Sequence, residues 1–307
     1  MTRARSFPCD AEQAGTKRRS ERGFIVVAVL WILIALAAFA SVYAFYAGNS
    51  AVAARVSGER LQSEALISGA LELTALRLLG GTKDDPRSSG DFQFQMRGAD
   101  IVVSFRSEGA RIDLNNAPKE LLAGLFQNLG AKPDDASSYA DRIIGWRKKN
   151  EVATQNKEAD VYKDAGLKYG PRQAPFQNVA ELRFVLGLPP DLVERAMPFV
   201  TIYNGLPQID VITAPSEVIM SLPHIAPDAV EAILQRRASQ DPKAILQLLG
   251  QAQDSVSIEP RKASRVDVAI KFKDGRRVSA EAVILLLNQD TEPYRILAWR
   301  DDFDGVF

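Results

Sequence analysis

Few side chains in this sequence carry the chemistry that catalysis requires. His224 is the only histidine, and it lies in the segment L-P-H-I-A-P, which is typical of a turn. The sequence contains no G-x-S-x-G, H-E-x-x-H or G-x-G-x-x-G motif and no P-loop. A lone histidine without a nucleophile or a second metal ligand is usually a surface or packing residue. We therefore predict that the protein is not an enzyme.

Cysteine and carboxylate chemistry is equally limited. Cys9 is the only cysteine, so the chain can form no internal disulfide and no multi-cysteine metal site. We expect the adjacent acidic pairs to be loop and helix-start charges: Asp84-Asp85, Asp134-Asp135 and Asp301-Asp302. The elements that carry these residues are therefore a better guide to function than the residues themselves.

The strongest element is an apolar segment near the N-terminus. Residues 24–54 carry no charged side chain, and the most apolar part is residues 24–47. About 20 apolar residues are enough to cross the hydrocarbon core of a bilayer as a helix. A basic cluster precedes the segment and consists of Lys17, Arg18, Arg19 and Arg22. By the positive-inside rule we expect that end to be cytoplasmic and the chain after about residue 50 to lie across the membrane.

Charge argues against a nucleic-acid partner. The chain has 38 basic and 38 acidic residues, and residues 1–23 contribute a net charge of +3. The rest of the chain therefore carries a net charge of −3, whereas nucleic-acid-binding proteins usually present a basic face. The chain is long enough for one or two domains with cores of their own beyond the apolar segment.

Periodicity predicts the elements that follow. From Ala51 onward apolar residues recur at helical spacing, and Gly80-Gly81 is a typical helix stop. Strand-like runs begin at Phe92, Asp100, Val266, Val278 and Tyr294. Hairpin turns are predicted at Gly98-Ala99 and at Asp274-Gly275. The long stretch between the two β regions is rich in helical patterns.

This helical stretch contains an internal repeat. The segment I-D-L-N-N-A-P-K-E-L-L begins at Ile112, and I-D-V-I-T-A-P-S-E-V-I begins at Ile209. Ala-Pro favours the start of a helix, and Glu120 and Glu217 would then lie in the first turn, where they complement the helix dipole. Second short helices are expected from Ala140 and from Ala229, and a further turn-plus-helix unit over residues 175–188.

These units resemble helix-hairpin-helix motifs, which often bind DNA phosphates through a glycine-containing hairpin. The hairpins here read N-L-G-A-K-P, L-G-L-P-P and L-P-H-I-A-P, and none has the G-h-G turn that allows close phosphate approach. The basic residues of the repeats are limited to Arg142, Arg147, Lys148 and Lys149. We therefore predict helix-hairpin-helix-like repeats that do not bind nucleic acid.

Taken in order, these segments resemble the minor pseudopilin K of type II secretion systems, the general secretion pathway protein K family. The resemblance rests on the basic-Gly-Phe junction, the long helix and the order I-D-L-N-x-A, I-I-x-W-R, P-F-x-N-V-x-E-L-R and I-D-V-x-T-A-P. It implies an α+β fold in which a pilin-like N-terminal helix packs on an antiparallel sheet, with a large inserted α-helical domain. The sheet would come from residues 81–113 and 251–307, and the inserted domain from residues 114–250.

The same resemblance implies that the N-terminus is processed. A prepilin peptidase would remove the leader, residues 1–23, by cutting between Gly23 and Phe24. Phe24 would then be N-methylated at the start of the transmembrane helix, residues 24–47, which continues as an amphipathic helix to about residue 80. An uncleaved signal anchor is the alternative. Most pseudopilins have glutamate as the fifth mature residue, but that place here is Ala28, and K-type subunits also lack the glutamate.

The resemblance also implies a place in the fibre. In the family, the glutamate pairs with the N-terminal amine of a neighbouring subunit, so Ala28 and a bulky insertion suit the tip of the pseudopilus. The protein would initiate pseudopilus assembly and support export of folded proteins across the outer membrane. Implied partners are the I-type and J-type minor pseudopilins, the major pseudopilin fibre and the prepilin peptidase. The implied location is the bacterial inner membrane, as a single-pass protein with its C-terminal domain in the periplasm.

Calcium is the one cofactor that the resemblance suggests, because family members can bind it in the helical domain. The candidate ligands are Glu151, Glu158, Asp160 and Asp164. Calcium takes six to eight oxygen ligands, and two lysines stand where acids would be expected, so a solvated charged loop is the alternative.

Two other functions are alternatives to this interpretation. A membrane-anchored periplasmic helix-hairpin-helix DNA-binding protein would require a basic hairpin face and salt-dependent affinity. An anchored periplasmic enzyme or binding module would require a compact pocket lined by acids with strongly perturbed pKa values.

Overall fold

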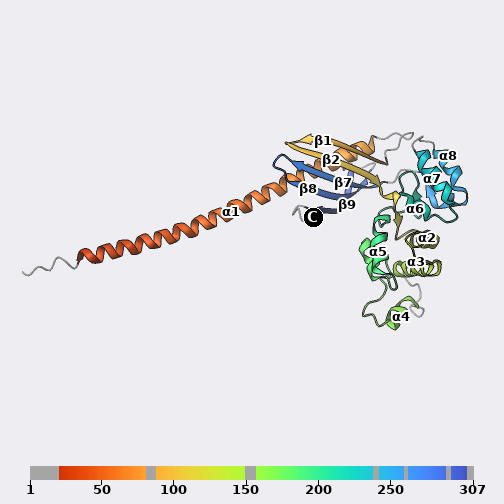
Figure 1. Ribbon diagram of the computed structural model, residues 1–307, viewed down its shortest axis with the longest axis horizontal. Coiled ribbons are helices and arrows are strands. Elements are labelled where there is room, and N and C mark those ends of the chain that lie inside the picture. Colours follow the sequence, from red (N-terminus) through yellow and green to blue (C-terminus); the bar gives the residue numbers. More distant parts are fainter. Residues whose placement is uncertain are drawn as a thin grey trace, which may run out of the picture. The chain divides into compact units, whose positions relative to one another are not determined.

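The structure is a computed structural model that describes residues 21–80, 88–148, 157–237, 242–258, 262–287 and 292–302. The chain divides into two compact units, Met1–Gln62 and Ser63–Phe307. Figure 1 labels the elements along the chain.

The long helix predicted from the apolar and amphipathic segments is confirmed. Helix α1 (Glu21–Leu79) contributes to both units, and its large apolar side chains from Phe24 to Val56 are exposed. A run of apolar side chains of this length is unfavourable in water, which indicates a lipid or protein environment. The helix ends where Gly80 donates its backbone N–H to the Leu76 carbonyl at 3.0 Å.

Five antiparallel strands form one sheet in the order β1-β2-β7-β8-β9 (Figure 1). The strands are β1 (Ser89–Met96), β2 (Ala99–Ser107), β7 (Ala263–Phe272), β8 (Arg277–Leu286) and β9 (Tyr294–Asp302). The β1–β2 turn is Arg97-Gly98, one residue earlier than predicted, and Gly98 has a φ of 78°. The β7–β8 turn contains Asp274-Gly275 as predicted, with Gly275 at a φ of 90°, which glycine adopts without strain.

The sheet has one buried and one exposed face because its strands alternate. In β2 every second side chain is buried, and the intervening side chains face out. The buried face packs against the C-terminal part of α1, and this core includes Leu66, Ile67, Leu71, Ile101, Val103, Val266 and Val268. The amphipathic second half of α1 is therefore a core element of the second unit.

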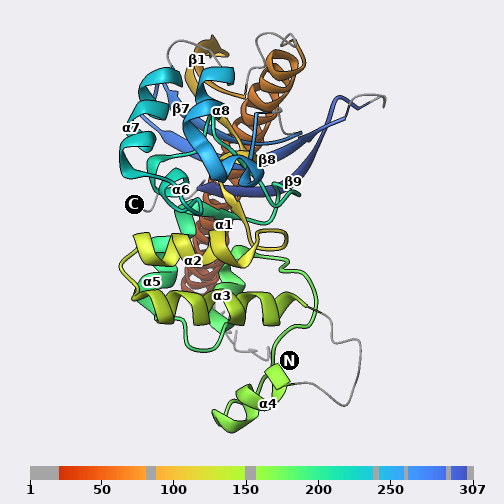
Figure 2. The same ribbon diagram turned by 90° about the vertical axis from the view of Figure 1, so that its right-hand side faces the viewer.

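The helical insert runs between β2 and β7. Its helices are α2 (Lys119–Asn128), α3 (Pro133–Arg147), α4 (Lys157–Asp164), α5 (Pro190–Ala196), α6 (Ser216–Met220), α7 (Pro227–Arg236) and α8 (Pro242–Leu249). Figure 2 shows α2 and α3 side by side. A second core, distinct from that of the sheet, fills the insert and includes Leu121, Phe126, Ile143, Trp146 and Ile219.

Several details differ from the sequence-based expectations. Residues 175–188 form no α-helix, and Val179–Phe184 is a 3₁₀ helix that begins at Asn178, whose side chain accepts the Ala180 N–H at 2.8 Å. The helix expected from Ala140 begins earlier, at Pro133, because proline is well suited to the first helical position. His224 lies in a turn as expected, with a φ of 59°.

Candidate functional site

The expected cleavage site lies at the start of the apolar helix. Because α1 begins at Glu21, the Gly23–Phe24 peptide bond lies in its first turn. The Phe24 side chain is 76% exposed, whereas Ala28 is half-buried. Lys17, Arg18 and Arg19 lie outside the described residues, and nothing is described for the side chain of Arg22. Within the described part, α1 is the one helix that is long and apolar enough to cross a membrane.

The first copy of the sequence repeat begins with a short strand and a turn. Strand β3 (Ile112–Asp113) pairs in parallel with β4 (Val200–Thr201). The Asp113 carboxylate then organises the turn, since Oδ1 accepts the backbone N–H groups of Asn115 at 2.7 Å and Asn116 at 3.1 Å. Pro118 is the N-cap of α2, as the Ala-Pro signal predicted.

The second copy repeats this construction. Strand β5 (Ile209–Asp210) pairs in parallel with β6 (Val256–Ser257). Asp210 accepts the Ile212 N–H at 3.0 Å and the Thr213 hydroxyl at 2.6 Å, and Pro215 is the N-cap of α6. The two segments that match in sequence are therefore also equivalent in hydrogen bonding.

An arginine at the end of the second helix of each copy fastens that helix to the turn. Arg147 donates to the carbonyl oxygens of Leu114 at 2.5 Å and Ala117 at 2.7 Å. Arg237, just after α7, donates through Nε to the Val211 carbonyl at 2.9 Å and through Nη2 to the Ala214 carbonyl at 2.6 Å. Burial lowers the pKa of both guanidinium groups, and Asp113 and Asp210 oppose this effect in the first and second copy. We call these two interactions the arginine clamps.

The clamps also bear on the nucleic-acid alternative. Two of the four basic residues noted in the repeats bind within the protein, because Arg142 pairs with Glu158 at 2.8 Å and Arg147 forms the first clamp. Lys148 is exposed, and Lys149 lies outside the described residues. Arg142 and Arg147 are therefore not available as a phosphate-binding hairpin face.

The candidate calcium ligands are not brought together in the described part of the chain. Glu158 forms the ion pair with Arg142, while Asp160 and Asp164 are exposed on α4. Glu151 lies outside the described residues. No group of three or more metal-binding side chains occurs among the residues that the structure describes. The calcium site stays a prediction.

A buried ion pair joins the sheet to the insert, and no sequence motif pointed to it. Glu108 is fully buried and follows β2; its carboxylate accepts from Arg265 Nε of β7 at 2.7 Å and from the Thr201 hydroxyl of β4. Arg265 also pairs with Glu281 of β8 at 2.6 Å. Burial lowers the pKa of Arg265, but the carboxylates of Glu108 and Glu281 raise it by a larger amount. The pKa of Arg265 therefore lies above its usual value.

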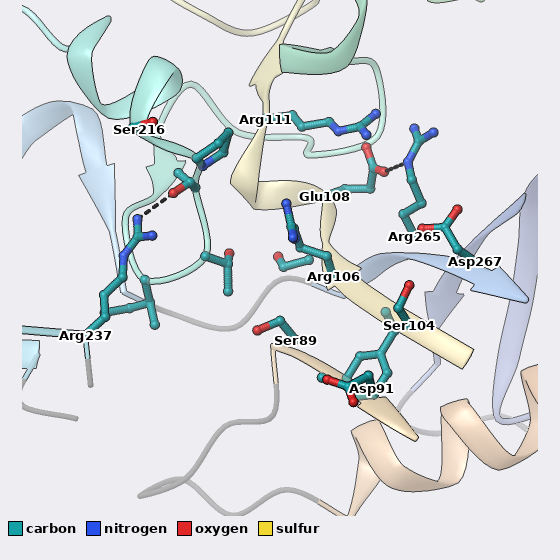
Figure 3. A pocket seen from close by; sticks show the side chains of 17 residues that line it. Ser89, Asp91, Ser104, Arg106, Glu108, Arg111, Ser216, Arg237, Arg265 and Asp267 are labelled. Atoms are coloured by element: carbon teal, nitrogen blue, oxygen red, sulfur yellow. Dashed lines mark hydrogen bonds and ion pairs between the residues drawn. The ribbon is translucent and has the colours of Figure 1, made fainter. Parts of the chain in front are cut away.

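A polar cavity of about 740 Å³ adjoins this ion pair. Figure 3 shows its lining: the first residues of β1, the end of β2, part of β7, and the loop that precedes α6 with the second arginine clamp. Its charged lining residues are Asp91, Arg106, Glu108, Arg111, Arg237, Arg265 and Asp267. Burial and the neighbouring Glu281 raise the pKa of Asp267, whereas the nearby arginines oppose that rise.

Part of the sequence matches a known protein family. Residues 102–205, which include the first repeat copy, match the family model described as type II secretion system (T2SS), protein K. Over these 104 of the 307 residues, the sequence is similar to protein K of type II secretion systems. No curated protein matches the sequence.

The fold is also similar to that of a solved structure. It resembles one chain of the crystal structure of the GspK-GspI-GspJ complex from the enterotoxigenic Escherichia coli type 2 secretion system. The similarity covers 80% of this chain and 98% of that chain, with a TM-score of 0.58 and 17% sequence identity. The likeness supports the α+β arrangement of a long N-terminal helix, a five-stranded antiparallel sheet and a helical insert.

Proposed function

We propose that this protein is the minor pseudopilin at the tip of the type II secretion pseudopilus, where it initiates assembly and supports export of folded proteins across the outer membrane. The observation that carries the proposal is the combination of an apolar helix without glutamate at Ala28 and a large helical insert. The insert adds a second core beside the pilin-like helix and sheet, and such a mass is easiest to accommodate where no further subunit has to be stacked.

The partners we propose are the I-type and J-type minor pseudopilins and the major pseudopilin fibre. Support comes from the similar crystal structure, which is that of a GspK-GspI-GspJ complex. The exposed apolar side chains of α1 fit this role, because a fibre of such helices would cover surface that is otherwise stable only in lipid. We further propose that the two repeat copies are helix-hairpin-helix-like units that serve protein packing.

The location we propose is the bacterial inner membrane, crossed once, with the second unit in the periplasm. A prepilin peptidase would cut between Gly23 and Phe24, and the new N-terminus at Phe24 would be methylated. The exposed Phe24 and the apolar helix that follows agree with a junction at the membrane surface.

Intact mass and N-terminal sequencing test the processing step. The protein extracted from membranes should begin at methylated Phe24 when the peptidase is present and should keep residues 1–23 when it is absent. Gly23→Leu should block cleavage, whereas the matched change Gly48→Leu, at a helix position with open space around it, should not. A full-length product in the presence of the peptidase would contradict the proposal.

Fibre formation tests the position at the tip. Cells without this protein should form far fewer pseudopili when the major pseudopilin is overproduced, and gold labelling of an epitope on the insert should mark one end of each fibre. Ala28→Glu should retain membrane insertion but shift labelling from the end into the fibre. Labels spread along wild-type fibres would contradict a tip position.

A further inference from the structure

The polar cavity beside the Glu108–Arg265 ion pair contains arginine side chains that do not pair with the carboxylates of the cavity. Arg265 is engaged by Glu108 and Glu281, and Arg237 by the carbonyls of its clamp. Within the described residues, no hydrogen bond or ion pair engages the side chains of Arg106 and Arg111. Figure 3 shows Arg106 between the arginine clamp on one side and the Glu108–Arg265 pair on the other.

The positive charges lie close enough to repel one another. Burial lowers the pKa of Arg111, and the neighbouring Arg265 lowers it further. Arg106 has the same kind of effect on Arg237. A group whose charged form is disfavoured in this way gains stability when an anion enters the space beside it. The guanidinium group also has five donors in a planar arrangement that matches a carboxylate or a phosphate.

The charge balance favours a carboxylate over a phosphate. Four arginines and three carboxylates line the cavity, which leaves a single positive charge. A dianionic phosphate or a polyanion would meet Asp91, Glu108 and Asp267 at close range, whereas one carboxylate would balance the site. Hydroxyl groups of Ser89, Ser104, Thr213 and Ser216 add neutral hydrogen-bonding groups to the walls.

The geometry of the sheet favours a carboxylate that is part of a peptide. The cavity is lined by the first residues of β1, and in the described residues β1 pairs only with β2, so its other edge is open. An extended segment can add to such an edge through backbone hydrogen bonds. A volume of about 740 Å³ accommodates several residues rather than a single small anion.

We propose that this cavity binds an acidic residue of an extended segment from a partner protein, with the segment added to the free edge of β1 and its carboxylate held by Arg106 and Arg111. The residues that line the site include none from the apolar segment or from the processed N-terminus. The site therefore provides the second unit with a specific contact for a partner, independent of contacts made by the apolar part of α1.

The test uses the full chain purified in detergent and a fluorescein-labelled peptide of alternating valine and threonine with one central glutamate. The matched control peptide has glutamine in place of the glutamate. Fluorescence anisotropy should show saturable binding of the glutamate peptide that weakens with salt, and binding of the glutamine peptide that is weaker by about tenfold. Arg106→Gln and Arg111→Gln should each weaken the binding of the glutamate peptide to a similar extent. Arg195→Gln, an exposed arginine of α5, is the control that should leave binding unchanged.

Four results would overturn the proposal. These are equal affinity for the two peptides, unchanged affinity in the exposed Arg106→Gln variant, no binding at about 1 mM peptide, and displacement of the peptide by inorganic phosphate more readily than by excess unlabelled peptide. The last result would assign the cavity to a free phosphate group. None of these results bears on cleavage at Phe24 or on fibre formation, so the proposed tip function is tested independently of this site.

Discussion

At the scale of single residues, Glu108 is the position where a charge is most costly to bury. A fully buried carboxylate is costly to keep charged unless it is paired and hydrogen-bonded. Glu108 meets both conditions, with Arg265 on one oxygen and the Thr201 hydroxyl on the other. Because these partners come from the sheet and from the insert, one side chain links the two cores of the second unit.

Glu108→Gln tests this link. The change preserves the shape of the side chain and a carbonyl oxygen, but it leaves the Arg265 charge with Glu281 as its remaining partner. We expect the free energy of unfolding to fall by about 3 kcal/mol, measured by urea denaturation. The control is Glu194→Gln in the exposed pair with Arg183, for which we expect a loss of less than about 1 kcal/mol. Equal losses in the two variants would contradict a special role for the buried pair.

The burial of Tyr162 predicts that the folded protein loses stability at alkaline pH. Its ring is fully buried beside Trp146, its hydroxyl accepts the Leu186 N–H at 2.9 Å, and burial raises its pKa to about 12. The phenol is therefore harder to ionise in the folded chain than in the unfolded chain, where the pKa is about 10. This contribution is complete below about pH 10 and is lost as the pH rises from about 10 to 12.

Thermal unfolding as a function of pH measures the Tyr162 contribution. Tyr162→Phe lacks the titrating hydroxyl, so the stability of the wild type relative to the variant should fall steadily over that pH range. At neutral pH the variant should be less stable by about 1 kcal/mol, because the Leu186 N–H loses its acceptor. A difference that stays constant from pH 9 to about pH 12 would show that the Tyr162 hydroxyl does not titrate in this way.

At the scale of elements, α2 and α6 approach each other at a glycine. A Cβ atom on Gly124 would lie 2.2 Å from the backbone oxygen of Ser221, which follows α6. The Asn128 side chain, one turn later in α2, donates to the Ser221 hydroxyl at 3.3 Å. The two repeat copies therefore touch through backbone, which leaves no room for a side chain.

Gly124→Ala should destabilise the protein, although alanine is the better helix former. The clash can be relieved only by a backbone shift, so we expect a loss of about 1–3 kcal/mol in unfolding free energy. Gly69→Ala in α1 is the matched control, because its nearest neighbour would be the Met96 sulfur at an ordinary 3.9 Å. That change should stabilise by about 0.5–1 kcal/mol. Stabilisation by both changes would contradict the close approach.

The elements also show which signals in the sequence were sufficient. The long helix, the hairpins and the repeat were predicted because periodicity, turn residues and sequence identity between copies are local signals. The arginine clamps were missed, although an arginine ends the second helix of both copies, because the carbonyl groups they bind are chosen by the tertiary fold. The short parallel pairs β3–β4 and β5–β6 were also missed, since each has two residues per strand and partners far along the chain.

At the scale of the whole molecule, the insert leaves and rejoins the sheet at neighbouring points. Strands β2 and β7 are adjacent and antiparallel, and Ser107 pairs with Ser264. The insert has its own core, so its removal should leave the packing between α1 and the sheet in place.

Replacement of residues 108–262 by an Asn-Gly turn tests this independence. The shortened chain should keep the circular dichroism signal of the sheet and unfold cooperatively, with a melting temperature lower by about 5–10 °C because the junction contacts are lost. A chain of the same length with scrambled β7 residues is the control that should not fold. Loss of the sheet signal in the shortened chain would show that the insert is required for the sheet.

The candidate binding cavity could not be predicted from the sequence at all. Its walls come from β1, β2, β7 and the loop before α6, which are far apart along the chain and carry no shared motif. Arg106 lies opposite Arg265 only because of the register between β2 and β7. Hydropathy and helical periodicity located the apolar helix and the insert, but the charges that meet between the sheet and the insert required the three-dimensional arrangement.

The adjacency of Ser107 and Ser264 has a consequence for the order of folding. The neighbouring strands β2 and β7 leave the ribosome at different times, because β7 follows the entire insert. Joining distant strands across a loose loop costs entropy, and contacts of high sequence separation slow folding. An insert that collapses first around its own core, with β3 paired to β4 and β5 paired to β6, brings its two ends close together and shortens the effective loop. The insert would then act as a folding template for the sheet, and destabilised variants of it should slow sheet formation more than they weaken the finished sheet.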